Sequence, residues 1–170
     1  IRHGFRLVWM WKGHNSFQRF RGKIQKAHIA NQDLHSTNNC MNASTISKYK
    51  TKSIPYLRKK AGEVFRAWIR KRDEGKPCIS CGSWNTSDAG HYYSAGNYPA
   101  LEFNEQNTNL QCRKCNRFLS GNLLEYRKGL IKKIGVEEVE KLDMLVAQYK
   151  QLGYKQDRFF LIDIIEKYSH

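Results

Sequence analysis

The sequence predicts an α+β protein in which a small zinc-stapled core is flanked by α-helices. Three observations lead to this fold class. Two Cys-x-x-Cys pairs bracket a short segment near the middle of the chain. Apolar residues recur at helical spacing before and after that segment. A chain of 170 residues, of which 40% are hydrophobic, is expected to form one modest domain with extensions.

The composition is strongly basic. Thirty Lys and Arg residues stand against 15 Asp and Glu, which gives a formal net charge of +15. A charge of this size predicts a polyanionic partner, with nucleic acid first and an acidic membrane surface a distant second. No apolar run approaches the roughly 20 residues that a membrane span needs, so we expect no insertion into a membrane.

Residues 1–47 form an unassigned basic segment at the start of the chain. The segment is rich in Lys, Arg and His, contains Asp33 as its single acid, and shows no lasting helical or strand periodicity. A DNA-binding arm is one interpretation, and a poorly ordered leader is the other. We assign it no function from the sequence.

Residues 48–76 contain a basic amphipathic helix, expected from Tyr56 to Arg72. Bases outnumber acids in this segment, so its charged face, including Arg70 and Lys71, predicts contacts with phosphates; a merely solvated face is the alternative. Gly75 and Pro77 end the helix before the first cysteine pair. The apolar stripe consists of Leu57, Ala61, Val64, Phe65, Trp68 and Ile69.

Residues 77–122 hold the two cysteine pairs. Four thiolates complete a tetrahedral Zn²⁺ shell with no open position, so this zinc would be structural. Two disulfides in a secreted protein are the alternative. No signal peptide is visible and Cys40 is left over as a free thiol, which favours a reducing compartment and metal binding. The predicted zinc ligands are Cys78, Cys81, Cys112 and Cys115.

Residues 123–170 predict three helices. The first runs from Leu123 to Ile134 and is closed by Gly135 as a C-cap. The second runs from about Glu137 to Leu152, and the third from about Asp157 to Tyr168. Their apolar faces are expected to form core or a partner surface.

One histidine that the zinc does not need lies between the cysteine pairs. His91 ends the run Asp-Ala-Gly-His that begins at Asp88, and Asn116 follows the last cysteine of the second pair. A neutral imidazole can take a proton from water that attacks a phosphodiester. The oxygens of Asp88 and Asn116 suit Mg²⁺ or Mn²⁺. A polar histidine with no catalytic role is the alternative.

These motifs resemble the zinc-containing HNH nucleases, also called His-Me finger or ββα-metal nucleases. More closely, the runs CISCG, DAGHY, LEFNEQN, QCRKCN, SGNLLEYR and LIKKIG are similar to the phage NinG (Rap) family. The similarity covers about residues 56–140, and we expect it to reach neither residues 1–47 nor the last twenty. The resemblance implies a ββα-metal core, activity on Holliday junctions and D-loops, and a place in the cytoplasm of a bacterial host.

The resemblance also implies a role for each residue of the site. His91 matches the general base, and Asp88 with Asn116 matches the ligands of a catalytic Mg²⁺ or Mn²⁺. Asn107 matches the residue that orients the histidine. Asn122 is a weaker candidate, and a turn residue is its alternative role.

Most HNH enzymes place the acid directly before the histidine, where this chain has Gly90. Residues three apart in a regular strand face opposite sides of a sheet. We therefore expect a bulge or bend at Ala89–Gly90 that lets Asp88 and His91 share one site.

Several further cations lie beside the second cysteine pair and on the helix that follows. We expect them to bind phosphates on either side of the scissile one, with simple surface charge as the alternative. Tyr92 and Tyr93 are expected to pack around the hairpin in preference to stacking on bases. The cations are Arg113, Lys114, Arg117, Arg127 and Lys128.

Together these features predict a metal-dependent, structure-specific DNA endonuclease that acts on branched recombination intermediates. A homodimer is expected to suit a four-way junction, because symmetric cutting needs two active sites. The alternative is a non-catalytic zinc-ribbon module that binds branched or double-stranded DNA, since such a module needs only the cysteines and the charge. A protein-binding scaffold built on the C-terminal helices would leave the charge unexplained.

Overall fold

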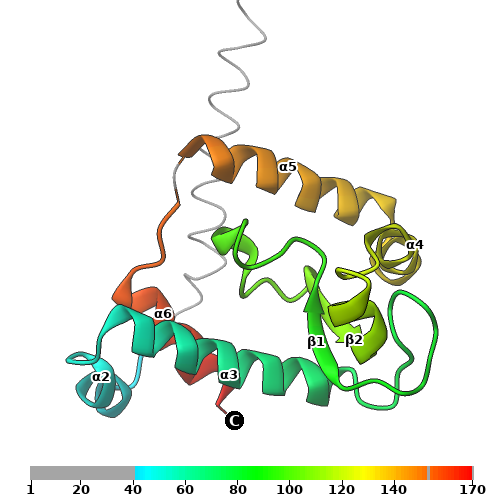
Figure 1. The fold of residues 1–170 in the computed structure, drawn as a ribbon. Helices are drawn as coiled ribbons and strands as arrows, with labels where there is room; N and C mark the ends of the chain where they lie inside the picture. The colour runs from blue at the N-terminus through cyan, green and yellow to red at the C-terminus, as the bar shows by residue number, and fades with distance from the viewer. Residues whose placement is uncertain (1–40, 153, 170) are drawn as a thin grey trace, which may run out of the picture. The chain divides into compact units, whose positions relative to one another are not determined.

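The computed structural model describes residues 41–152 and 154–169, and Figure 1 gives the labels of the elements. Helix α2 spans Ala43–Tyr49 and α3 spans Ile54–Arg72. The Ser53 hydroxyl accepts a hydrogen bond from the Tyr56 amide at 3.4 Å and caps α3. The expected helix 56–72 is therefore confirmed. Helix α2 was not predicted, and it crosses the expected boundary between residues 47 and 48.

A small antiparallel sheet follows α3. Strand β1 spans Asp88–His91 and β2 spans Thr108–Gln111, with Asp88 opposite Gln111 and His91 opposite Thr108. A single 3-10 turn, η1, covers Pro99–Leu101 between the strands, and a π-helical turn, η2, covers Lys114–Phe118 after them.

Three helices complete the described chain, and they confirm the helices expected after residue 122. Helix α4 spans Leu123–Ile134 and ends at Gly135, whose φ of 89° suits glycine. Helix α5 spans Val136–Leu152 and α6 spans Arg158–Tyr168. The Asp157 side chain caps α6 by accepting from the Phe160 amide at 2.9 Å.

Two apolar clusters lie on either side of the sheet, and the helices around it are visible in Figure 1. The first cluster joins α3, α6 and Tyr49 of α2 to Ala89 of β1 and Phe103 of the loop between the strands. The second joins α4 and α5 to Leu101 of η1. Because a hairpin of two short strands is marginal alone in water, these clusters fix its position.

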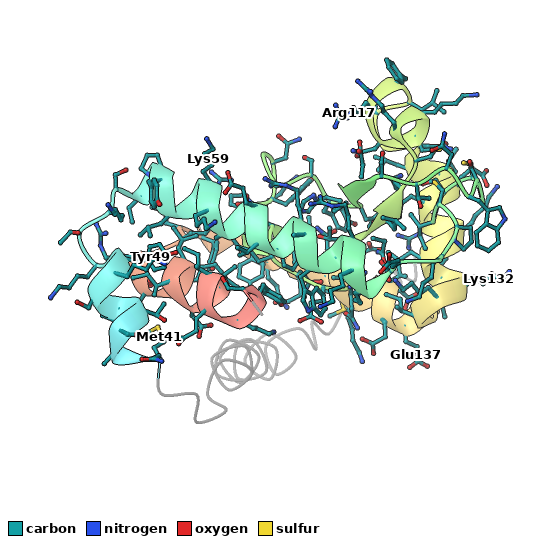
Figure 2. The ribbon with its side chains drawn as sticks, turned by 90° about the horizontal axis from the view of Figure 1, so that it is seen from below. Met41, Tyr49, Lys59, Arg117, Lys132 and Glu137 are labelled. Atoms are coloured by element: carbon teal, nitrogen blue, oxygen red, sulfur yellow. The ribbon has the colours of Figure 1, made fainter. Side chains whose placement is uncertain are left out.

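Most of the charged side chains lie on the outside of this fold, whereas Asp73 and Glu102 are buried. Figure 2 shows Lys59 on α3 and Arg117 on η2, both of them exposed. Within residues 41–152 and 154–169, no helix combines the length and apolar character that crossing a bilayer requires. Residues 1–40, including Cys40 and most of the unassigned basic segment, lie outside the described residues.

Candidate active site and metal centre

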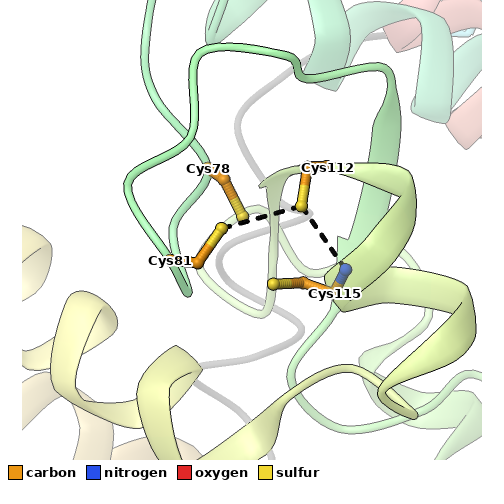
Figure 3. A group of neighbouring side chains, drawn as sticks. All are labelled: Cys78, Cys81, Cys112 and Cys115. Carbon is orange, nitrogen blue, oxygen red and sulfur yellow. Dashed lines mark hydrogen bonds between the residues drawn. The ribbon is translucent and has the colours of Figure 1, made fainter.

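Four cysteine side chains meet where two turns of the chain approach each other (Figure 3). Their Sγ atoms all lie within 4.8 Å of one another, and the Sγ atoms of Cys81 and Cys112 are 3.7 Å apart. Sulfur ligands about 2.3 Å from a tetrahedral Zn²⁺ are roughly 3.8 Å from each other, so the spacing fits this ion. All four are free thiols. The predicted clustering is confirmed, and the cluster can hold a metal ion such as zinc.

The turns around the cysteines direct backbone amides toward sulfur. The Cys115 amide lies 3.4 Å from the Cys112 Sγ. Burial would raise the pKa of Cys78, but hydrogen bonds from backbone amides, first that of Cys112, lower it to about 7. Burial raises the pKa of Cys115 to about 12. Four adjacent thiolates repel one another, so a bound cation is what would allow all of them to ionise.

Asn122 belongs to this metal centre and not to the site around His91. Its backbone is left-handed, with a φ of 46°, and its side-chain nitrogen lies 3.5 Å from the Cys115 Sγ. Asparagine tolerates this conformation better than most residues. The turn role expected as the alternative is thus the one the structure shows.

His91 ends strand β1 and is held by the loop that follows. Its Nε2 lies 2.8 Å from the backbone oxygen of Glu102. A carbonyl oxygen only accepts hydrogen bonds, so Nε2 must carry the proton and Nδ1 of the neutral ring keeps a free lone pair. Burial lowers the pKa of His91 below its ordinary value, and the charge of Arg66 lowers it further, while Glu102 opposes both. The ring is therefore neutral at neutral pH and can accept a proton at Nδ1.

Asn107 closes the loop that holds His91. It is fully buried, accepts from the Tyr93 amide at 2.8 Å, and donates to the backbone oxygens of Tyr93 at 3.0 Å and Leu101 at 2.9 Å. Leu101 directly precedes Glu102, which binds the histidine. Asn107 therefore ties together the loop that contains Glu102, and its side chain has no direct hydrogen bond to the ring of His91.

Asp88 and Asn116 come together at the other end of β1. The Asn116 Nδ2 donates to Asp88 Oδ2 at 2.9 Å, and Arg117 Nε donates to the same oxygen at 2.9 Å. Burial would raise the pKa of Asp88, but hydrogen bonds from Asn116, Arg117 and Ser87 lower it below its ordinary value. A charged carboxylate thus lies beside an amide, and their oxygens suit a hard divalent cation.

The strand places His91 and Asp88 on opposite faces of the sheet. Each residue of β1 from Asp88 to His91 pairs with one residue of β2, so the bulge expected at Ala89–Gly90 is absent and that expectation is wrong. The regular pleat directs Ala89 and His91 toward α3, and Asp88 and Gly90 toward Gln111 and Asn116. In the usual HNH arrangement the acid directly precedes the histidine, and these two adjacent residues also face opposite sides of the strand. Asp88, three residues before His91, therefore faces the same side as an acid at position 90 would.

Gln111 connects the metal centre to strand β1, and sequence reasoning missed it. Its Nε2 donates to Ser80 Oγ at 2.7 Å and to the Gly121 oxygen at 2.8 Å, both in turns around the cysteines. The Gly121 carbonyl can only accept a hydrogen bond, so the Nε2 of Gln111 must face it and the Oε1 of Gln111 must point away from it. This Oε1 atom has no hydrogen-bond partner among the described residues. A Cβ on Gly90 would lie 1.9 Å from this oxygen. Glycine at position 90 therefore permits the close approach.

Comparison with known proteins connects this arrangement to a family. The family model described as Bacteriophage Lambda NinG protein matches residues 12–169. The chain belongs to the NinG family. The match extends beyond residues 56–140 on both sides and includes residues 12–47 and most of the last twenty. The expectation that the similarity reaches neither of these two segments is therefore wrong.

Three curated NinG relatives show how much of each protein is shared. Protein ninG of Escherichia phage lambda is 44% identical over 100 residues, which cover 58% of this chain and 49% of that protein. Protein ninG of Escherichia phage 933W is 43% identical, with 58% and 50% covered. That of Salmonella phage P22 is 42% identical, with 58% and 49% covered. The matched region is about half the length of these relatives, and no solved structure matches the chain.

The NinG-family chain uses some of its predicted DNA-binding cations in ion pairs of its own. Arg127 pairs with Asp143 at 2.8 Å and donates to the Tyr92 hydroxyl at 2.8 Å, which ties α4 to α5 and to the end of β1. Lys128 pairs with Glu125 at 2.7 Å, and Arg117 pairs with Asp88 as described. The remaining four are exposed: Arg70, Lys71, Arg113 and Lys114.

Asp73 is a second residue that sequence reasoning missed in this NinG-family chain. Its carboxylate is buried at the end of α3 and pairs with Arg72 at 2.5 Å, Lys76 at 3.1 Å and Lys133 at 3.1 Å. It also accepts from the Leu110 amide at 3.3 Å. Arg72 and Lys76 are neighbours of Asp73 in the sequence, but Lys133 of α4 and Leu110 of β2 are distant, so nothing in the sequence indicated that this carboxylate is buried.

Proposed function

We propose that this chain is a metal-dependent, structure-specific DNA endonuclease with an HNH, or His-Me finger, site. The observation that carries the proposal is the hydrogen bond between His91 and Glu102, which leaves Nδ1 free to accept a proton. Burial keeps the pKa of this imidazole below its ordinary value, so the basic form predominates at neutral pH. This is the state that a general base for phosphodiester hydrolysis needs.

Asp88 and Asn116 would hold a catalytic Mg²⁺ or Mn²⁺ through their side-chain oxygens. When bound, such an ion offsets the negative charge that develops on the phosphate and on the leaving oxygen. Arg117 now neutralises Asp88, and its side chain is 58% exposed, so it can turn toward solvent and bind DNA instead. In this proposal His91 takes the proton of the attacking water, and products carry a 5′-phosphate and a 3′-hydroxyl. Because Asp88 and His91 face opposite sides of β1, the proposal requires the end of this strand to bend when the ion or DNA binds, so that both act on one phosphate.

The substrate in this proposal is branched DNA, in keeping with the net charge of +15 and the membership of the NinG family. Exposed cations on α3 and beside the second cysteine pair would hold phosphates, while the cysteine-bound zinc would fix the turns that carry Asn116. A homodimer would cut both strands of a four-way junction. Such a protein would act in the cytoplasm of a bacterial cell that a phage has infected.

Cleavage of labelled linear, flap and four-way DNA with Mg²⁺ or Mn²⁺ tests the proposal. We expect the wild type to cut branched substrates and His91→Ala to lose at least about 100-fold in rate. Zinc content and DNA affinity should stay at the wild-type level in His91→Ala. Retained nicking by that variant would refute the assignment of the base, and binding without strand breaks by the wild type would favour a non-catalytic module.

A further inference from the structure

One stripe of helix α3 runs past the loop that holds His91. Arg58, Gly62 and Arg66 are four residues apart and therefore lie on one side of the helix. The Arg58 Nε pairs with the Glu102 carboxylate at 2.8 Å, and the backbone oxygen of Glu102 binds His91. Helix α3 also packs directly on β1, on the face toward which His91 points. The stripe consequently brings Arg66 to the vicinity of the histidine.

Gly62 is a buried glycine inside this helix, where glycine is among the least favourable residues. A Cβ at this position would lie 2.7 Å from Nη1, 3.3 Å from Cζ and 3.4 Å from Nη2 of Arg66. Long side chains on a helix lean toward its N-terminus and cover the residue four positions earlier. The space that a side chain would fill is thus occupied by the Arg66 guanidinium.

Among the residues that the structure describes, Arg66 has no partner for its charge. Arg58, Arg72 and Arg117 each pair with a carboxylate, whereas Arg66 makes no hydrogen bond or ion pair with any residue that the structure describes. Its charge nevertheless reaches His91, because it lowers the pKa of that imidazole. A guanidinium held by the helix and left without an acceptor has N–H donors available for a ligand.

We propose that Arg66 and His91 form a subsite for one phosphodiester group of DNA, in which the guanidinium binds the phosphate that is attacked. The planar fork of arginine matches two phosphate oxygens at once. At this place it would also offset the charge that grows on those oxygens during attack. The proposal rests on the nuclease function proposed above and adds a phosphate-binding residue to it.

The subsite has an electrostatic consequence for the histidine. The charged groups that face His91 are Arg66 from α3 and Glu102 from the loop, and they act in opposite directions on its pKa. Removing or displacing the guanidinium should raise the pKa of His91. The acidic limb of the pH–rate profile should then move to higher pH, which a purely structural role for Arg66 would not produce.

Three variants and one control test the subsite. Arg66→Ala removes the guanidinium, and Arg66→Lys keeps the charge without the fork. Gly62→Ala displaces the guanidinium while favouring the helix, since alanine is the better helix former and the three atoms nearest its Cβ belong to the flexible end of Arg66. Lys155→Ala removes one exposed charge from the loop before α6 and serves as the matched control.

Binding of a four-way junction, measured without added Mg²⁺ or Mn²⁺ at several salt concentrations, tests the phosphate contact independently of catalysis. The slope of log affinity against log salt should fall by about 1 in Arg66→Ala and stay unchanged in Lys155→Ala. An unchanged slope in Arg66→Ala would overturn the phosphate contact even if the wild type cuts DNA.

Single-turnover cleavage tests whether the bound phosphate is the one attacked. We expect Arg66→Ala to lose about 100-fold in rate and Gly62→Ala at least about 10-fold, with Arg66→Lys between Arg66→Ala and the wild type. The melting temperature of Gly62→Ala should not fall. Wild-type rates in both Gly62→Ala and Arg66→Ala would overturn the subsite. A wild type that cuts no DNA would instead refute the nuclease function, while the salt slopes would still decide the contact.

Discussion

Gly129 of α4 lies directly against the backbone oxygen of Ile79, in the turn between Cys78 and Cys81. A Cβ on Gly129 would be 1.9 Å from this oxygen and 3.0 Å from the Ile79 carbonyl carbon. A backbone carbonyl cannot rotate away as a flexible side chain can. The contact therefore fixes the separation between the metal centre and α4, and glycine is the residue that allows it.

Gly129→Ala should consequently destabilise the protein in spite of the better helix propensity of alanine. We expect the free energy of unfolding to fall by about 2 kcal/mol, measured by urea denaturation in the presence of zinc. Gly96→Ala is the control, because a Cβ there meets no atom within 4 Å. Equal stability of the two variants would contradict the close contact.

Gly90 and Gln111 should be energetically coupled. Gly90→Ala places a Cβ against the buried Gln111 oxygen, so we expect a loss of about 1–3 kcal/mol. In a Gln111→Ala background the same substitution should cost at least about 0.5 kcal/mol less. A double-mutant cycle of unfolding free energies measures the difference. Additive effects would show that the two residues do not conflict.

Asp73 should make stability depend on pH at the acid end. Burial would raise its pKa, but Arg72, Lys133 and Lys76 lower it far below its ordinary value. The carboxylate therefore contributes fully above the unfolded pKa of about 4, and its contribution is lost as pH falls below that value toward the folded pKa.

Asp73→Asn should lower the unfolding free energy by about 2–3 kcal/mol at pH 7 and flatten its decline below pH 4. Glu74→Gln, at the exposed neighbouring position, is the control. Urea denaturation between pH 3 and 7 would measure both effects. A decline in Asp73→Asn as steep as in the wild type would exclude Asp73 as its source.

The four-cysteine cluster should bind one zinc per chain. Cys112→Ser should lose this metal and much of the cooperative unfolding transition, because metal binding and folding are linked. Cys40→Ser, outside the two Cys-x-x-Cys pairs, should keep both. Elemental analysis and thermal unfolding measure the outcome. Loss of zinc in Cys40→Ser, or its retention in Cys112→Ser, would count against the assigned ligands.

The cleavage rate should follow the titration of His91. Because burial lowers the pKa of this residue below its ordinary value of 6.5, the basic form predominates at neutral pH. Single-turnover rates should rise with pH below 6.5 and level off above it. A midpoint of the acidic limb above 6.5 would disagree with a buried, neutral base.

The helices were the most predictable part of the fold. Their apolar residues recur at regular spacing, and Gly135 and Asp157 occupy the cap positions that sequence rules assign to them. Helix α2 escaped prediction because it is short and depends on distant contacts. Glu166 of α6 accepts the Asn42 amide at 3.0 Å just before α2 begins.

The site was predictable in its chemistry but not in its geometry. Cysteine spacing identified the metal cluster, and the Asp-Ala-Gly-His run drew attention to His91. The regular register of β1, the orientation of Gln111 and the ion pair between Asp73 and Lys133 arise from residues far apart in the chain. Arg127 is a further example. Its guanidinium was expected to bind DNA phosphates, but it pairs with Asp143, which comes from another helix.

The hairpin that carries His91 has four residues in each strand. One face of the hairpin packs against α3 through Ala89. On the other face, the side-chain amide of Asn116, which directly follows Cys115, donates a hydrogen bond to Asp88. Excising residues 77–122 as an independent peptide would remove the first of these supports. The smallest fragment that retains the histidine in its native pose must therefore begin at or before Ile54 and include α6, whose side chains complete the same core.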